Sequence, residues 1–210
     1  MGSRTRKSGY YISDADRFAL STDLMNEIPE SRDAVLTLEW ETVPGLPEGF
    51  EVAIPIWLDI DGACLPHDAE VSVPNNTQTF SFVMDPPWTA NFSAKTLVMA
   101  GHLHDGGENL VIMKNGQPYC NSVAKYGESA GYISGTPGMP GMNMGGSMLH
   151  TTATSHISSM SVCSAEESIK PGDRWSVRAN YNLTEHAPMM EQEKTPAPIM
   201  GIGFMYIAKV

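Results

Sequence analysis

The chain has 210 residues, of which 41% are hydrophobic and 18% are charged, and its formal net charge at pH 7 is -11. This length fits a single domain, and the hydrophobic content is enough for a buried core. The acidic balance argues against binding nucleic acid or an anionic membrane through the overall field, and it favours metal cations or basic partners. No run of 18 apolar residues occurs, so the sequence predicts no transmembrane span.

Two features bear on the cellular compartment. N-glycosylation sequons begin at Asn75, Asn91 and Asn182, and three cysteines allow one disulfide bond with one thiol left over. No signal peptide is visible in this chain. We still expect a secreted, extracellular glycoprotein, because sequons and disulfides are features of the secretory route.

The pattern along the chain indicates strands. Residues 1–16 are expected to form a flexible N-terminal lead, and residues 17–210 a single domain. Short apolar runs of strand length lie at 17–25, 34–43, 50–60, 77–84, 95–104, 108–120, 156–163, 174–183 and 200–210, separated by Pro, Gly, Asn and Asp. Asn115-Gly116 divides one run and predicts a tight hairpin. About nine or ten strands with this spacing predict an all-β fold, an antiparallel β-sandwich or jelly roll.

One segment, residues 132–155, interrupts this pattern and is expected to be a long loop insertion. Among its Gly and Pro residues stand four methionines, Met139, Met142, Met144 and Met148. Two interpretations stay open. Several thioethers in a flexible setting could gather Cu(I), or the segment is a low-complexity insertion whose methionine content has no role.

The candidate metal ligands begin with His102 and His104, two residues apart on the predicted strand 95–104. Residues i and i+2 point to the same face of a strand, so the two imidazoles lie within reach of one metal ion, while Leu103 points into the core. Asp105 is a candidate acceptor that would fix the tautomer of a ligand. The spacing alone is equally compatible with two surface histidines that hydrogen-bond to their neighbours.

A third ligand must come from elsewhere in the chain. Met200 begins the final apolar run, and its thioether is a soft ligand that selects copper, above all Cu(I). Taken alone, Met200 is better explained by core packing. His186 precedes this run, and His150 and His156 flank the far end of the methionine-rich segment, whereas His67 is expected in a loop without a partner.

Residues 95–208 resemble the C-terminal domain of the copper type II, ascorbate-dependent monooxygenases, namely peptidylglycine alpha-hydroxylating monooxygenase and dopamine beta-monooxygenase. The resemblance rests on "MAGHLHDGGENLVIMKNGQPY", and on "GDRWSVRANYN" followed by "IMGIGFMYIAKV". It implies copper as cofactor, held by His102, His104 and Met200, with His186 as a fourth ligand or a neighbour of the ligands. O2 and a small-molecule substrate are the implied partners. Those enzymes hold a second copper ion through three histidines of a separate domain, and we do not expect that domain here.

A second resemblance extends from about Phe18 to the end of the chain. It is to uncharacterised secreted fungal proteins related to the plant stress-upregulated nodulin-19-like family. The shared pattern includes "GHLHDGG" at 101–107, Cys120, the region 156–163 and "MGI" at 200–202. This resemblance implies no particular chemistry.

The cysteines allow more than one pairing. Cys120 closes the predicted hairpin and Cys163 ends the run 156–163. A bridge between them would enclose about 40 residues and stabilise the fold by roughly 3 to 4 kcal/mol. Cys64 would then be free, but a bridge from Cys64 to either partner stays open.

The sequence therefore supports the hypothesis of a secreted β-sandwich that binds one copper ion and acts in copper handling or copper-dependent oxidation. Whether the chain is an enzyme is left open. The rival hypothesis is a metal-free extracellular interaction or carbohydrate-binding module. Its stacking surface would come from the tryptophans, Trp40, Trp57, Trp88 and Trp175.

Overall fold

The computed structural model describes residues 7–20, 22, 31, 33–62, 69–134, 154–164, 166–191 and 195–210. These residues form strands and connecting turns together with one short 3-10 helix, η1 (Ala130–Tyr132), so the predicted all-β class is confirmed. No helix in this part of the chain has the length and apolar character needed to cross a membrane. The strands are β1 (Ser8–Gly9), β2 (Glu51–Val52), β3 (Ile54–Asp59), β4 (Thr79–Val83), β5 (Trp88–Thr89), β6 (Ala94–Leu103), β7 (Gly107–Lys114), β8 (Gln117–Tyr126), β9 (Ile133–Ser134), β10 (Thr154–Ser155), β11 (Ile157–Met160), β12 (Val162–Cys163), β13 (Ser168–Ile169), β14 (Arg174–Asn182) and β15 (Gly201–Lys209).

The chain divides into two compact units, Met1–Ala53 and Ile54–Val210. In the first unit β1 and β2 pair in parallel. The strands predicted at 17–25 and 34–43 are wrong for the residues described there, which form no strand and are exposed. A strand is stable only when a neighbour takes up its backbone hydrogen bonds, and the described residues of these two segments have no strand partner. The prediction of one domain from residue 17 onward stays a prediction.

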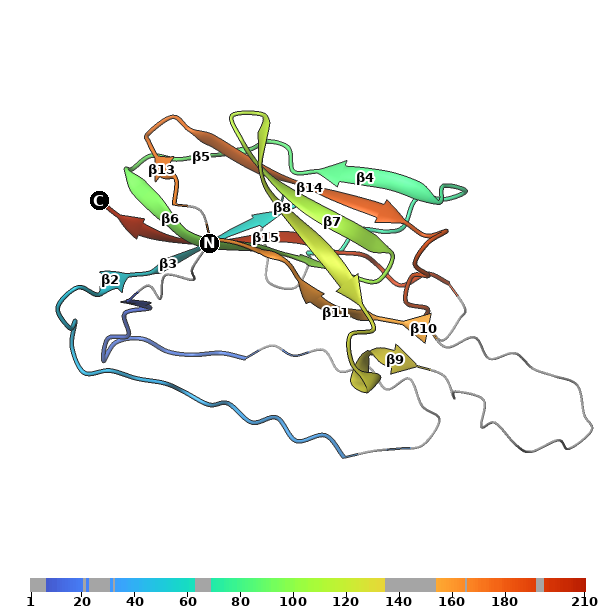
Figure 1. Cartoon of the computed structure of the whole chain (residues 1–210), viewed down its shortest axis with the longest axis horizontal. Helices are drawn as coiled ribbons and strands as arrows, with labels where there is room; N and C mark the ends of the chain where they lie inside the picture. Colours follow the sequence, from blue (N-terminus) through green and yellow to red (C-terminus); the bar gives the residue numbers. More distant parts are fainter. Residues whose placement is uncertain are drawn as a thin grey trace, which may run out of the picture. The chain divides into compact units, whose positions relative to one another are not determined.

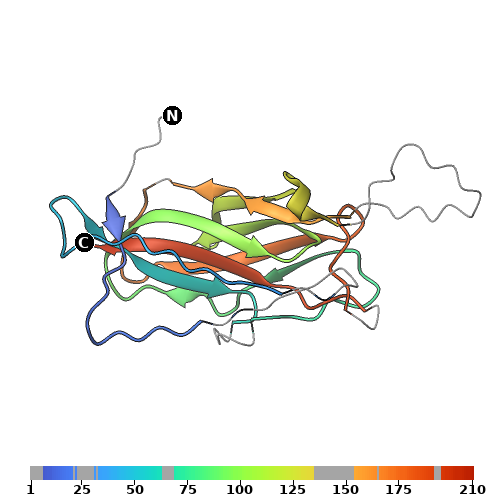
Figure 2. The same cartoon turned by 90° about the horizontal axis from the view of Figure 1, so that it is seen from below.

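The second unit contains two larger antiparallel sheets, which confirms the predicted sandwich (Figure 1). One sheet has the order β11-β8-β7-β14-β4, with β5 also pairing with β14. The other has the order β12-β6-β15-β3, with β13 also pairing with β6. Figure 2 shows β3, β15 and β6 side by side in one layer. The two ends of the chain segment 94–209 thus meet in a single sheet.

Alternation of side chains along these strands builds the core between the sheets. Met99 and Leu103 of β6 are buried, as are Val177 and Tyr181 of β14. Leu103 therefore points into the core, as the two-residue period predicts. His102, between Gly101 and Leu103, is exposed on the outer face of its sheet.

The sheets approach each other most closely where glycines lack a side chain. A Cβ atom on Gly101 would lie 2.8 Å from Cβ of Leu110, and one on Gly203 would lie 2.6 Å from Cγ1 of Val177. Both distances are well below the optimal separation of two carbon atoms. Glycine is therefore needed for β6 and β15 to rest on β7 and β14. This close packing places the ends of β6 and β15 against β14.

The turn between β7 and β8 confirms the hairpin predicted at Asn115-Gly116. Both residues have positive φ, 51° for Asn115 and 78° for Gly116. Positive φ at both central positions is the signature of the type I′ turn, which suits the twist of a two-residue hairpin. The turn fixes the register in which β8 returns along β7.

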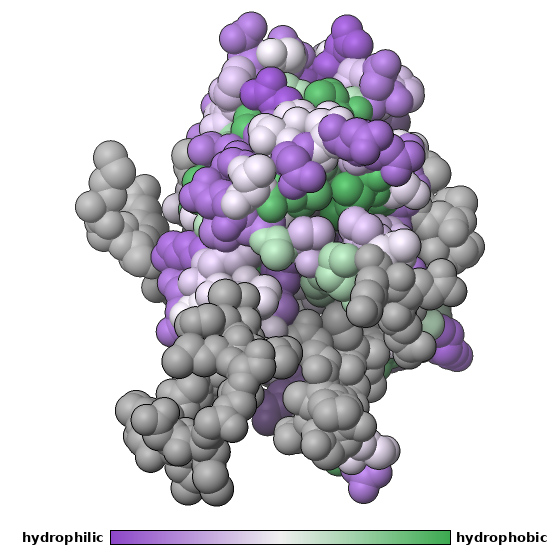
Figure 3. Space-filling model, turned by 90° about the vertical axis from the view of Figure 1, so that its right-hand side faces the viewer, coloured by the Kyte–Doolittle hydropathy of each residue, from purple (hydrophilic) through white to green (hydrophobic). Residues whose placement is uncertain are grey.

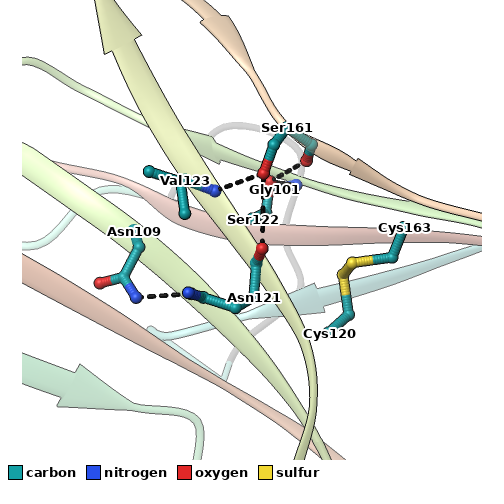
Figure 4. The surroundings of a disulfide bond; sticks show 8 residues. All are labelled: Gly101, Asn109, Cys120, Asn121, Ser122, Val123, Ser161 and Cys163. Atoms are coloured by element: carbon teal, nitrogen blue, oxygen red, sulfur yellow. Dashed lines mark hydrogen bonds between the residues drawn. A yellow bond between two sulfur atoms is a disulfide. The ribbon is translucent and has the colours of Figure 1, made fainter.

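A disulfide bond joins Cys120 of β8 to Cys163 of β12, and so links the two sheets (Figure 4). This is one of the pairings that the sequence leaves open, and Cys64 lies outside the described residues. Beside the bridge, the buried Ser122 hydroxyl donates to the carbonyl of Ser161 at 2.6 Å and accepts from the amide of Gly101 at 2.9 Å. The covalent link and this hydroxyl hold β6 and β12 against β8.

The predicted loop insertion is shorter than expected at both ends. β9 and β10 pair with each other, with Ser134 opposite Thr154, so the flanks of the segment 132–155 form a small sheet. Pairing gives these flanking residues backbone hydrogen bonds that a loop would leave to water. The four methionines and His150 lie outside the described residues.

Candidate metal centre

His102 and His104 stand at the end of β6, where the chain turns towards β7. His102 belongs to the strand, and His104 follows Leu103, its last residue. Their ring centroids are 5.6 Å apart and the rings are nearly perpendicular, at 87°. The structure thus brings the two imidazoles together, as their spacing predicts.

The tautomer of His104 follows from its hydrogen bond. Its Nδ1 atom lies 2.7 Å from the carbonyl oxygen of Pro198. A carbonyl can only accept, so Nδ1 carries the proton and donates it, which leaves the lone pair on Nε2 for a metal. The backbone of Pro198 has the role that the sequence assigned to Asp105, and this prediction for Asp105 is wrong. Asp105 turns instead towards His156.

His102 is kept in its neutral form. Desolvation of the ring lowers the pKa of His102 below its ordinary value, and the neighbouring His104 lowers it further. A metal binds the neutral imidazole, so a lowered pKa reduces the competition from protons. The side chain retains exposed surface. His102 is therefore both accessible and ready to bind.

The pairing of β15 with β6 brings the chain at Met200 close to the chain at His104. Gly201 pairs with Leu103 and Ile202 with His102. Met200 and His104 directly flank the last of these pairs, outside the strands. A continued alternation would turn the Met200 side chain to the face that carries His102. The Met200 side chain is half-buried.

A buried hydroxyl connects the two chain segments that carry these residues. Oη of Tyr181, on β14, accepts a hydrogen bond from the amide of His104 at 3.3 Å. The same hydroxyl donates to the carbonyl oxygen of Met200 at 2.5 Å. Burial raises the pKa of Tyr181, so the hydroxyl keeps its proton. Sequence reasoning missed Tyr181, and its inward position in the alternation of β14 was the available signal.

His186 occupies a different setting from the histidine pair. Its ring lies flat on the ring of Tyr126, with centroids 3.7 Å apart and planes 5° apart. The Tyr126 hydroxyl donates to the carbonyl of Gly107 at 2.8 Å and accepts from the amide of Gly106 at 3.1 Å. His186 thus supports the turn that follows His104. Its role as a metal ligand stays a prediction.

Asp105 anchors the same turn from another direction. One carboxylate oxygen accepts the amide of Ile157 at 2.8 Å, and the other is 2.5 Å from Nδ1 of His156. Nε2 of His156 is 2.8 Å from the hydroxyl of Ser134. Both ring nitrogens of His156 are thus engaged within the fold, which makes it a structural histidine. His67 and His150 lie outside the described residues.

The described residues offer few of the usual metal ligands around the histidine pair. Among the described residues, no three His, Cys, Asp or Glu side chains gather at one point. A three-ligand site made from this part of the chain therefore needs a further type of ligand, and Met200, which precedes β15, stays the predicted candidate. Figure 3 looks onto the side where β15 begins and β14 ends, and hydrophilic residues there surround a smaller hydrophobic area.

Three of the four tryptophans lie in the second unit, in different environments. Trp175 is fully buried. Trp88 is half-buried and contacts Phe92. Trp57 is exposed, with its ring nearly perpendicular to that of Phe204, at 85°. The described residues of the second unit therefore contain no pair of exposed, coplanar tryptophan rings.

Comparison with known proteins gives two curated relatives. The chain is 30% identical over 203 residues to the probable copper-dependent oxygenase M1 of Phoma sp. (strain ATCC 20986 / MF5453), covering 97% of this chain and 46% of that protein. It is also 30% identical over 203 residues to the probable copper-dependent oxygenase clz3 of Cochliobolus lunatus, covering 97% of this chain and 58% of that protein. The chain thus spans about half the length of the curated relatives it matches. No protein family model and no solved structure matches the chain.

Proposed function

We propose that this chain binds one copper ion through His102, His104 and Met200 and takes part in a copper-dependent oxygenation. The observation that supports the proposal is the contact of the two imidazoles at the end of β6, beside the point where the chain passes from Met200 into β15. The names of both relatives point to the same metal and the same class of reaction.

The chemistry of the donors fits copper better than other common metals. Imidazole nitrogen binds several transition metals, but thioether sulfur is soft and favours copper, above all Cu(I). A copper ion bound here would supply one-electron redox chemistry towards O2. Zinc and magnesium gain little from a methionine ligand, so the pairing of Met200 with the histidines separates copper from these metals.

The residues of the chain prepare this site before any metal binds. Pro198 fixes the His104 ring so that Nε2 is the free nitrogen. The lowered pKa of His102 keeps that ring neutral. The exposed surface of His102 leaves the site open to O2 and to a small-molecule substrate. These features support an oxidation carried out at the surface of the sheet rather than in a sealed cavity.

We also propose that the chain works in an oxidising compartment outside the cytosol. The disulfide between Cys120 and Cys163 supports this, because the cytosol keeps most thiols reduced. The sequons agree with such a route.

Metal analysis by mass spectrometry tests the proposed site. The chain is loaded with Cu(I) or Cu(II), desalted and assayed for copper per protein. We expect about one copper per chain, which the double substitution of His102→Ala with His104→Ala removes. His67→Ala, a histidine outside the proposed ligand set, serves as the matched control and should retain copper. Unchanged copper in the double variant would show that the site lies elsewhere.

A second assay separates oxidation from copper handling. Oxygen consumption is followed with ascorbate as the electron donor, in the loaded wild-type chain and in the double histidine variant. Consumption that depends on His102 and His104 supports an oxygenase. Tight copper binding without such consumption would contradict the oxidative role and leave copper handling as the function.

A further inference from the structure

Tyr181 is the one described residue whose side chain bonds to the backbones of both His104 and Met200. It belongs to β14, in the sheet opposite the one that carries the proposed ligands. Because β6 and β15 come from distant parts of the sequence, their relative position near the site depends on such contacts. The hydroxyl fixes the positions of both ligand-bearing backbones at one atom.

The position of this hydroxyl is set by packing that involves no metal. Tyr181 is fully buried. Its ring stacks on Phe80, with centroids 5.4 Å apart and planes 9° apart. A tyrosine held in this way presents Oη at a defined place, whether or not an ion is bound. The hydroxyl can therefore hold the backbone at residue 200 in a defined position by its hydrogen bond to the Met200 carbonyl.

We propose that Tyr181 is a positioning residue that holds Met200 beside the histidine pair and thereby sets the preference of the site for Cu(I) over Cu(II). The inference rests on the proposed copper site. The backbone carbonyl of Met200 is held at 2.5 Å from the hydroxyl, which restrains the backbone from which the Met200 side chain starts.

The physical reason lies in the different ligands of the two oxidation states. Imidazole nitrogen binds both Cu(I) and Cu(II), whereas thioether sulfur is the soft donor that favours Cu(I). A change that loosens Met200 should therefore weaken Cu(I) binding far more than Cu(II) binding. General damage to the fold would weaken both.

The experiment compares Cu(I) and Cu(II) affinities in Tyr181→Phe and wild type, by competition with chelators specific for each ion. The substitution keeps the stacked ring and removes only the hydroxyl. We expect a loss of about 10-fold to 100-fold in Cu(I) affinity, the effect typical of removing a partner of a metal ligand. Cu(II) affinity should fall much less, because Pro198 still holds the His104 ring when the bond from the His104 amide to the hydroxyl is lost. Tyr206→Phe, on the exposed face of β15, is the matched control and should change neither.

A double-mutant cycle with Met200→Leu tests whether Tyr181 acts through the methionine. In the Met200→Leu background the thioether is absent, so Tyr181→Phe should cause only the small further loss of Cu(I) affinity that comes from its bond to the His104 amide. An equal loss in both backgrounds, or equal losses for Cu(I) and Cu(II), would overturn the inference. Absence of histidine-dependent copper binding in wild type would instead overturn the proposed site itself.

A second measurement applies if Tyr181→Phe does not fold. 3-Fluorotyrosine is introduced at position 181 alone, which keeps the hydroxyl and adds a reporter for 19F NMR. Its resonance should shift on addition of Cu(I) in the otherwise wild-type chain and stay unchanged in Met200→Leu. The same shift in both proteins, or no shift in either, would show that Tyr181 does not sense Met200.

Discussion

Removal of the disulfide between the two sheets should cost a large part of the stability of the sandwich. The bridge joins Cys120 and Cys163, which are separated by 43 positions in sequence. Closing a loop of this length removes about 13 cal/mol/K of entropy from the unfolded chain, or about 4 kcal/mol at 25 °C. Replacing both cysteines by alanine should therefore lower the free energy of unfolding by about that amount. Both must be replaced, because a single variant would leave one cysteine free to pair with Cys64.

Equilibrium unfolding in urea, followed by circular dichroism, measures this loss. The reduced wild-type chain is the matched control, because it loses the crosslink but keeps both side chains. Its stability should fall close to that of the double alanine variant. The dependence of the free energy on urea should become steeper in both, because the unfolded chain expands without the bridge. A loss below about 1 kcal/mol would refute the loop-closure reasoning and indicate that the unfolded chain is equally restricted without it.

Three further changes probe other parts of the fold. Burial raises the pKa of Asp59, so the native state binds the Asp59 proton more tightly than the unfolded chain does. This proton therefore stabilises the fold below about pH 4, and the contribution to the free energy of unfolding is lost as pH rises through the native pKa. Asp59→Asn removes the titrating group and should flatten this dependence in urea titrations across the range, while also losing one of the two oxygens that accept from the Trp57 indole and the Asp61 amide. Gly203→Ala should cost about 1 to 3 kcal/mol in thermal or urea unfolding, because its Cβ would lie 2.6 Å from Val177, and an unchanged stability would mean that the sheets can separate freely. His186→Phe keeps a ring on Tyr126 and should leave the copper content unchanged, whereas copper loss in a folded variant would make His186 a ligand.

Local features of the structure could be predicted from neighbouring residues. The two-residue period places His102 and His104 on one face and Leu103 in the core, and the structure shows both. Asn115-Gly116 forms the hairpin turn because both residues tolerate positive φ. In each case the physical cause acts over a few residues. The same kind of pattern misled at 34–43, where apolar residues at strand length have no paired neighbour and form no strand.

Features that depend on distant residues were decided by the tertiary structure. The sequence singled out Met200 by its chemistry, but only the pairing of Gly201 with Leu103 brings the backbone at Met200 near the backbone at His104. Pro198 as the acceptor for His104, and His156 as the partner of Asp105, arise from segments that meet across the fold. Tyr181 reads as an ordinary core residue in the sequence. Its hydroxyl joins the two ligand-bearing backbones because the packing of the sheets brings three strands to one point, and no local pattern encodes that meeting.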